Sequence, residues 1–91
     1  MEKKITLHEF WTSKDHLAIH CDIEEKANNL LKFFDKLGKK WISKYSYLEI
    51  NHWAIYEEYT CYDNKKGYCH IDWYKQKSYK IYEFDEVDLD N

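Results

Sequence analysis

Residues 17–38 read LAIHCDIEEKANNLLKFFDKLG, and two different hydrophobic periods meet within this stretch. In its first five residues the side chains alternate, which places Leu17, Ile19 and Cys21 on one face of an extended segment. This period-two pattern is typical of a short strand. We therefore expect a strand at residues 17–21.

The residues that follow have the longer period of an amphipathic helix, which we place at residues 23–37. Asp22 and Glu25 have the spacing of a capping box at its start, and Gly38 suits the left-handed residue that ends a helix. The predicted strand therefore leads directly into a helix. Its apolar stripe consists of Ala27, Leu30, Leu31, Phe34 and Leu37.

The middle of the chain is less regular. Residues 40–43 predict a second short strand, and residues 44–48 predict a loop. Residues 51–59 fit a helical face and a strand face equally well, so both interpretations remain open.

The C-terminal third has the turn chemistry of a β-meander. Turn-rich residues 63–67 and the short loop 75–77 separate apolar runs at 59–62, 68–74 and 78–84. The loop lengths predict a register in which strands pair side by side in chain order.

This register places Cys61 opposite Cys69 and Ile71 opposite Ile81. We therefore predict an α+β fold: one helix packed on a mainly antiparallel sheet of about four to five strands, β-α-β followed by a C-terminal meander. Residues 1–91 are expected to form a single domain, with an acidic tail at residues 83–91.

The same register turns the three thiols toward the core and a set of phenol rings toward solvent. An exposed sheet face rich in Tyr is typical of a contact surface, because each ring offers apolar area with a polar tip. Two interpretations remain open: a binding surface for a partner, or packing against residues 44–57, the Phe10-Trp11 pair or a second copy in a homodimer. The predicted binding surface consists of Tyr62, Tyr68, His70, Tyr74, Lys80, Tyr82, Asp85 and Glu86.

Composition excludes several classes of protein. The chain has 91 residues, 19% of them aromatic, and no Pro, which is too apolar for a disordered segment. Its net charge is −3 and its 14 basic residues are all Lys, so duplex DNA is not an expected partner. Without a membrane span or signal peptide, and with three Cys, we expect reduced thiols in a cytoplasm.

Residues that could carry chemistry do not form a known motif. The Cys spacing lacks a C-x-x-C pair, so we expect buried thiols in place of a zinc site. Cys69 and His70 are neighbours on a strand and point to opposite faces, so they do not form a nucleophilic pair. His70 and Asp72 share a face, yet no nucleophile accompanies them. We therefore predict no enzyme activity, no metal and no cofactor.

Seven short motifs along the chain resemble small, uncharacterised phage and prophage proteins of low-G+C Gram-positive bacteria. One pattern departs from that resemblance: such proteins often have Trp-x-x-Gly-x-Ser after the helix, whereas here Lys44 stands in place of the Gly. The resembling residues are Leu17-Ala18-Ile19-His20-Cys21-Asp22, Glu24-Glu25, Leu30-Leu31, Leu37-Gly38-Lys39-Lys40-Trp41, Trp53, Thr60-Cys61-Tyr62 and Tyr79-Lys80-Ile81-Tyr82-Glu83-Phe84.

The resemblance implies a phage accessory protein, a group in which inhibitors of host immunity are frequent. We expect a phage-encoded, non-enzymatic binding protein that inhibits a bacterial defence component, anti-CRISPR-like or of another anti-immune type, in the host cytoplasm. The alternative is a sponge that sequesters a nucleotide immune signal, with aromatic rings stacked on the base. A host defence protein or a nucleotide is thus the expected partner.

Overall fold

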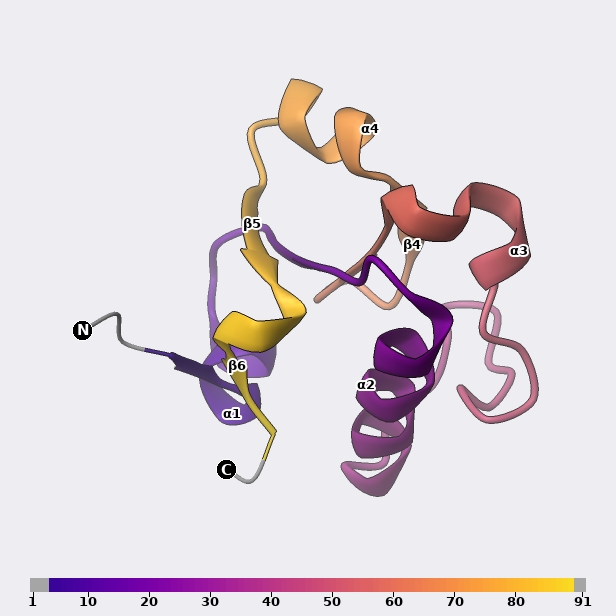
Figure 1. Cartoon of the computed structure of the whole chain (residues 1–91). Helices are drawn as coiled ribbons and strands as arrows, with labels where there is room; N and C mark the ends of the chain where they lie inside the picture. The colour runs from indigo at the N-terminus through magenta and orange to yellow at the C-terminus, as the bar shows by residue number, and fades with distance from the viewer. Residues whose placement is uncertain (1–3, 90–91) are drawn as a thin grey trace.

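The computed structural model describes residues 4–89 and is an α+β fold, as expected (Figure 1). The helical elements are α1 (Leu7–Thr12), α2 (Glu24–Lys36), α3 (Trp53–Tyr56), η1 (Glu57–Tyr59), α4 (Ile71–Gln76) and η2 (Phe84–Glu86). The strands are β1 (Ile5–Thr6), β2 (Leu17–His20), β3 (Thr60–Asp63), β4 (Tyr68–His70), β5 (Lys80–Glu83) and β6 (Val87–Asp88).

The main sheet has four strands in the order β4-β3-β2-β5. Its interior strand β2 pairs antiparallel with β3 and parallel with β5, so the sheet is mixed. A second, two-stranded sheet joins β1 and β6 in parallel. The first and last strands of the described chain are therefore neighbours.

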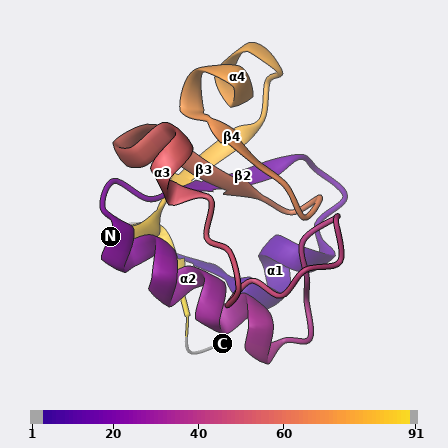
Figure 2. The same cartoon turned by 90° about the vertical axis from the view of Figure 1, so that its right-hand side faces the viewer.

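Helices cover both faces of the main sheet, with α1 and α2 on one side and α4 on the other (Figure 2). The larger core lies on the α2 side and contains Ile19 of β2 and Tyr62 of β3. The smaller core lies on the α4 side and consists of Ala18, Cys61 and Tyr74. Because both faces are covered, the successive residues Leu17, Ala18 and Ile19 of β2 are all buried.

Helix α2 confirms the predicted amphipathic helix to within one residue at each end, and Ala27, Leu30, Leu31 and Phe34 are buried as predicted. Leu37 of the predicted stripe is instead 50% exposed just after the helix. Gly38, which follows it, has a φ of +79°, as the predicted ending requires. The predicted cap is wrong: Ile23 occupies the N-cap position and no side chain caps the helix. Asp22 instead forms an ion pair with Lys26 one turn along, at 2.9 Å.

The hairpin of β3 and β4 confirms the predicted pairing of Cys61 with Cys69. The predicted meander is wrong beyond this point, because the chain turns into α4 at Ile71 and β5 pairs with β2. The His70 ring accepts a hydrogen bond from the Asp72 amide at 3.0 Å and so caps α4. Ile71 and Tyr74, three residues apart, then share the helix face that packs on the sheet.

The segment after α2 contains no strand at residues 40–43, contrary to the prediction. Trp41 and Tyr47 are buried there, with ring centroids 4.5 Å apart, and the Trp41 indole N–H donates to the Ile50 carbonyl at 2.8 Å. The path of the chain here is thus determined by the burial of these side chains and not by pairing with the sheet. The ambiguous residues 51–59 become α3 and η1.

The predicted acidic tail is wrong over most of its length. Its residues form η2 and then β6, in which Val87 is buried opposite Ile5 of β1. The apolar residues between the acidic ones therefore hold this segment on the core. Asp90 and Asn91 lie outside the described residues.

Candidate functional site

The predicted tyrosine surface does not exist as a continuous face. Tyr62 and Tyr74 each have 0% exposed area. Tyr62 points to the α2 side of the sheet, whereas Tyr74 lies on α4 and packs back against Cys61. The prediction assumed that one face of the sheet meets solvent, and it fails because both faces are covered.

The other predicted surface residues are partly or fully exposed, in different places. The Tyr68 ring stacks on His52 at 4.0 Å, and the His70 ring stacks on Tyr59 at 4.9 Å. The Lys80 ammonium lies over the Tyr82 ring, 5.3 Å from its centroid. Asp85 and Glu86 lie in η2, which follows β5.

Several polar side chains meet where β2 and β5 end. The two strands are parallel, so their carboxyl ends lie at the same edge of the sheet, and His20 pairs in register with Glu83. Helix α2 begins at this edge and η2 follows β5. The Cys21 amide also donates to the Thr60 carbonyl at 3.1 Å, which brings the end of η1 to the same place.

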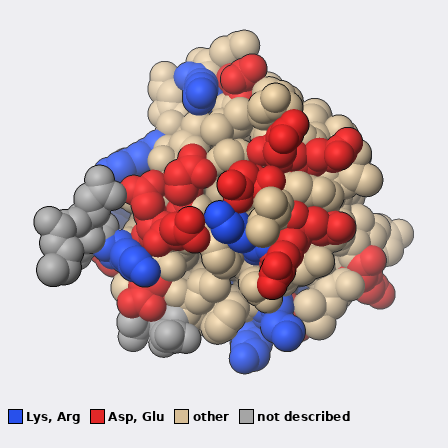
Figure 3. Space-filling model, viewed as in Figure 1, with Lys and Arg blue, Asp and Glu red and all other residues tan. Residues whose placement is uncertain are grey.

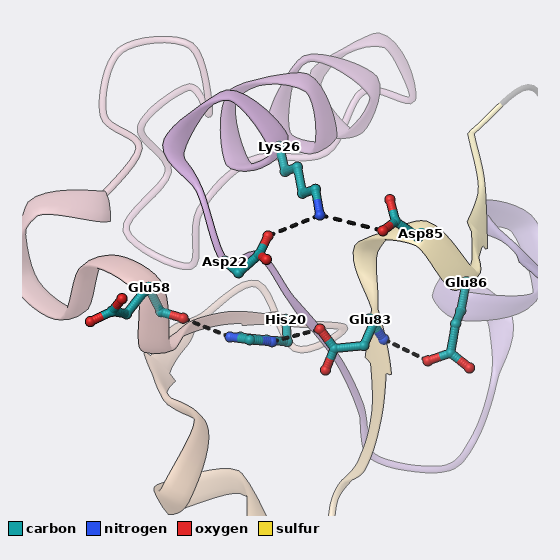
Figure 4. Close-up of polar contacts among 7 residues, drawn as sticks. All are labelled: His20, Asp22, Lys26, Glu58, Glu83, Asp85 and Glu86. Carbon is teal, nitrogen blue, oxygen red and sulfur yellow. Dashed lines mark hydrogen bonds and ion pairs between the residues drawn. The ribbon is translucent and has the colours of Figure 1, made fainter.

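The His20 ring joins three elements at this edge (Figure 4). Its Nδ1 lies 2.7 Å from Glu83 Oε1, and its Nε2 lies 2.7 Å from the Glu58 carbonyl oxygen. Because both partners are oxygen acceptors, a ring nitrogen makes a hydrogen bond to either of them only when it carries a proton. The side chain is only 14% exposed, so this contact ties η1, β2 and β5 together from within.

The turn that presents Glu58 has an unusual backbone. Glu57 has φ +48° and ψ −121°, a region that favours glycine. Such conformations persist where surrounding contacts hold them, and here the Glu58 carbonyl is held by His20. Tyr59 follows directly and is 50% exposed.

Lys26 of α2 bridges two carboxylates across the same edge. Its ammonium lies 2.9 Å from Asp22 and 3.4 Å from Asp85. The hydrogen bond with Asp22 raises the pKa of Lys26 and lowers the pKa of Asp22. The Glu83 amide donates to Glu86 at 2.9 Å, which orients that carboxylate as well.

The carboxylates of Asp22, Glu83, Asp85 and Glu86 are therefore held in one network beside Lys26 and His20, and Glu58 joins it through its backbone carbonyl. Asp and Glu side chains gather over the middle of this side of the molecule (Figure 3). Two apolar side chains flank them in sequence: Ile23, which follows Asp22, is 48% exposed, and Tyr59 follows Glu58. We call this surface the acidic face; it consists of Asp22, Glu58, Glu83, Asp85 and Glu86.

The cysteine thiols are buried or hydrogen-bonded within the fold. Burial raises the pKa of Cys61 to about 12 and also raises that of Cys21, so neither forms a thiolate near neutral pH. The partly exposed Cys69 thiol donates to the Tyr56 hydroxyl at 3.9 Å. Among residues 4–89, no group of three or more His, Cys, Asp or Glu side chains is placed to hold a metal ion.

The described surface has shallow pockets away from the acidic face. One, of about 550 Å³, lies between α2 and the loop at residues 47–51. A more apolar pocket of about 350 Å³ lies beside Trp11 of α1, and Lys39 already covers that ring at 5.2 Å. These hollows do not enclose a set of charged groups.

Comparison with known proteins adds no assignment. No family model matches the chain, and neither a curated protein nor a solved structure matches it. Over residues 4–89, the helices are too short and too polar to cross a bilayer.

Sequence reasoning identified two members of the acidic face, Asp85 and Glu86, and missed the others. It placed Asp22 in a helix cap and left Glu58 in an ambiguous segment. A parallel pairing of residues 17–20 with 80–83 would have brought them together, but local patterns do not specify which distant strand pairs with which.

Proposed function

We propose that this protein is a phage-encoded, non-enzymatic inhibitor that binds a basic surface of a bacterial defence protein through its acidic face. The observation that carries this proposal is the cluster of five acidic residues beside Lys26 and His20, in which hydrogen bonds to carboxylates and to the Glu58 backbone carbonyl join five elements. Defence nucleases expose basic grooves for nucleic acid, and a prearranged acidic surface complements such a groove.

The contacts within the acidic face favour binding over catalysis. His20 already uses both ring nitrogens, on the Glu83 carboxylate and the Glu58 backbone carbonyl, and Lys26 is shared between Asp22 and Asp85, so these groups are committed to holding the acidic face together. A surface ordered before binding loses little side-chain entropy when a partner arrives. The flanking Tyr59 and Ile23 offer the apolar contact area that charged interfaces need for affinity.

The proposed source and target class also rest on the resemblance to phage accessory proteins noted in the sequence. An acidic inhibitor of a nucleic-acid enzyme must compete with a polyanion, and its association rate should fall steeply with salt.

The test measures phage plating on cells that express this protein. Each strain carries one known defence system, chosen from nucleases of Gram-positive hosts. We expect this protein to restore plating in at least one strain by about tenfold or more, and Glu58→Lys with Asp85→Lys to abolish the effect. Asp15→Lys with Asp72→Lys changes the net charge equally at other exposed positions and should keep the activity.

The component of the restored system would then be purified, and displacement of its labelled nucleic acid measured by anisotropy. Displacement by this protein but not by the charge-reversed variant supports the proposal. Restoration in no strain, or equal restoration by the charge-reversed variant, would contradict it.

Sequestration of a nucleotide signal has less support. The pocket beside Trp11 offers a ring, but Lys39 occupies one side of it, and Phe10 and Phe34 pack edge-on against it at 5.3 and 4.8 Å. A base therefore has little free aromatic surface there on which to stack.

A further inference from the structure

Two turns meet at the edge of the sheet opposite the acidic face. One turn follows α2, where the Lys44 amide donates to the Trp41 carbonyl at 2.7 Å. The other is the tip of the β3–β4 hairpin, and the Ile42 amide donates to its Lys66 carbonyl at 3.0 Å (Figure 2). The hairpin tip lies beside the start of β2, because Asp63 pairs with Ala18. The acidic face lies at the other end of β2.

Each turn carries a lysine in a left-handed backbone conformation. The φ of Lys44 is +75° and that of Lys66 is +70°, where glycine is favoured. Strained backbone is often found at functional positions, and here both strained residues present an exposed ammonium.

Large apolar side chains are exposed on the same turn. Ile42 is 75% exposed and Tyr45 is 57% exposed. Trp41 and Tyr47 of the same segment are buried, with exposed fractions of 3% and 2%. The turn therefore presents its apolar groups from a fixed base, as interface anchors require. We call this surface the basic turn pair; it consists of Ile42, Lys44, Tyr45, Lys65 and Lys66.

The chain itself supplies a surface of complementary chemistry. The acidic face carries five carboxylates flanked by Ile23 and Tyr59, which are 48% and 50% exposed. The basic turn pair has three ammonium groups with Ile42 and Tyr45. Because the two surfaces lie at opposite edges of one sheet, a single molecule cannot join them to each other.

We propose that the basic turn pair is the docking surface for the acidic face of a second copy of this chain. The contact is head-to-tail, so it leaves one surface free at each end and can repeat. Self-association occupies the acidic face and therefore competes with any host partner. The proposal does not depend on that partner, because it concerns the purified protein alone.

Sedimentation velocity over a range of concentrations tests the proposal. At low ionic strength we expect reversible association that weakens as salt is raised. Lys44→Gly should weaken association about fivefold and at the same time raise the midpoint of thermal unfolding, because it removes both a charge and the strain. If Lys44 had only a structural role, the substitution would not weaken association while raising the midpoint of thermal unfolding.

Charge-swapped pairs give the sharper test. Lys44→Glu with Lys65→Glu reverses the basic turn pair, and Glu58→Lys with Asp85→Lys reverses the acidic face. Each variant alone should stay monomeric, and an equal mixture of the two should associate, because the intact acidic face of the first variant then meets the intact basic turn pair of the second. Lys75→Glu with Lys77→Glu, at the C-terminal end of α4, is the matched control and should associate like the original protein.

A monomer at every salt concentration, or association that survives either reversal alone, would overturn the proposal. A labelled single-stranded oligonucleotide provides a further check. If it binds the monomer and Lys44→Gly abolishes that binding, the basic turn pair is a nucleic-acid surface and the proposal is wrong.

Discussion

Asn64 shows how one polar residue holds three parts of the chain. Its carboxamide oxygen accepts from the Leu17 amide at 3.3 Å, and its nitrogen donates to the carbonyls of Phe10 and Asp15 at 3.1 and 3.0 Å. The side chain is 9% exposed, so water does not readily replace these partners.

Asn64→Ala should lower the free energy of unfolding by about 2–4 kcal/mol, because it leaves buried backbone groups unpaired. Urea denaturation measures this change. Asn29→Ala, at an exposed position of α2, is the control and should stay within about 0.5 kcal/mol of the original protein. A loss at Asn64 no larger than at Asn29 would show that water replaces the amide.

His52 gives stability a pH dependence at the residue scale. Partial burial against Trp41 and Tyr68 lowers the pKa of its imidazole below 6.5. The unfolded chain therefore takes up a proton at a higher pH than the folded chain. This contribution to stability is complete above pH 6.5 and is lost as pH falls from 6.5 through the lowered pKa.

His52→Asn should flatten the slope of unfolding free energy against pH in this window. Asn tolerates the left-handed φ of +56° at this position, so the backbone is preserved. Urea midpoints measured from pH 5 to pH 7.5 provide the readout. His8→Asn, at an exposed position of α1, should leave the slope unchanged. An unchanged slope in His52→Asn would contradict the proposed cause.

At the scale of elements, α4 is attached by one buried hydrogen bond and a small apolar contact. The Tyr74 hydroxyl donates to Asp63 Oδ2 at 2.6 Å, and Asp63 Oδ1 accepts from the amides of Lys65 and Gly67, both at 2.9 Å. Burial and the Asp63 carboxylate raise the pKa of Tyr74, so the hydroxyl keeps its proton.

Tyr74→Phe should cost about 1–3 kcal/mol, because it removes a hydrogen bond to a buried carboxylate while keeping the ring. Hydrogen exchange of the α4 amides and chemical denaturation both measure this effect, and α4 should exchange faster. Tyr79→Phe changes a ring whose centroid lies 4.9 Å from that of Tyr74, and it should lower the free energy of unfolding by less than about 0.5 kcal/mol. Equal costs at the two positions would exclude the Asp63 contact as the cause.

At the scale of the whole molecule, β2 is one of the two interior strands of the main sheet. It has a partner on each side and helices over both faces. Its amides should therefore exchange with solvent at least about tenfold more slowly than those of the edge strand β4. NMR hydrogen exchange tests this, and cross-peaks between Ala18 and Ile81 test the parallel pairing with β5. Cross-peaks between Ile71 and Ile81 in a strand register would contradict this pairing and support the meander predicted from the sequence.

Local patterns in the sequence determined β2, α2 and the β3–β4 hairpin, because each depends on neighbouring residues. Alternation placed Leu17 and Ile19 on one face, and the five-residue loop set Cys61 opposite Cys69. Only the tertiary structure decided that residues 71–76 become a helix, that β5 pairs with β2, and that Tyr62 and Tyr74 are buried. Those outcomes depend on contacts between segments distant in the chain, where an apolar residue finds a partner that its own neighbours do not specify. The acidic face belongs to this second group, since its five carboxylates meet only after the parallel strands have paired.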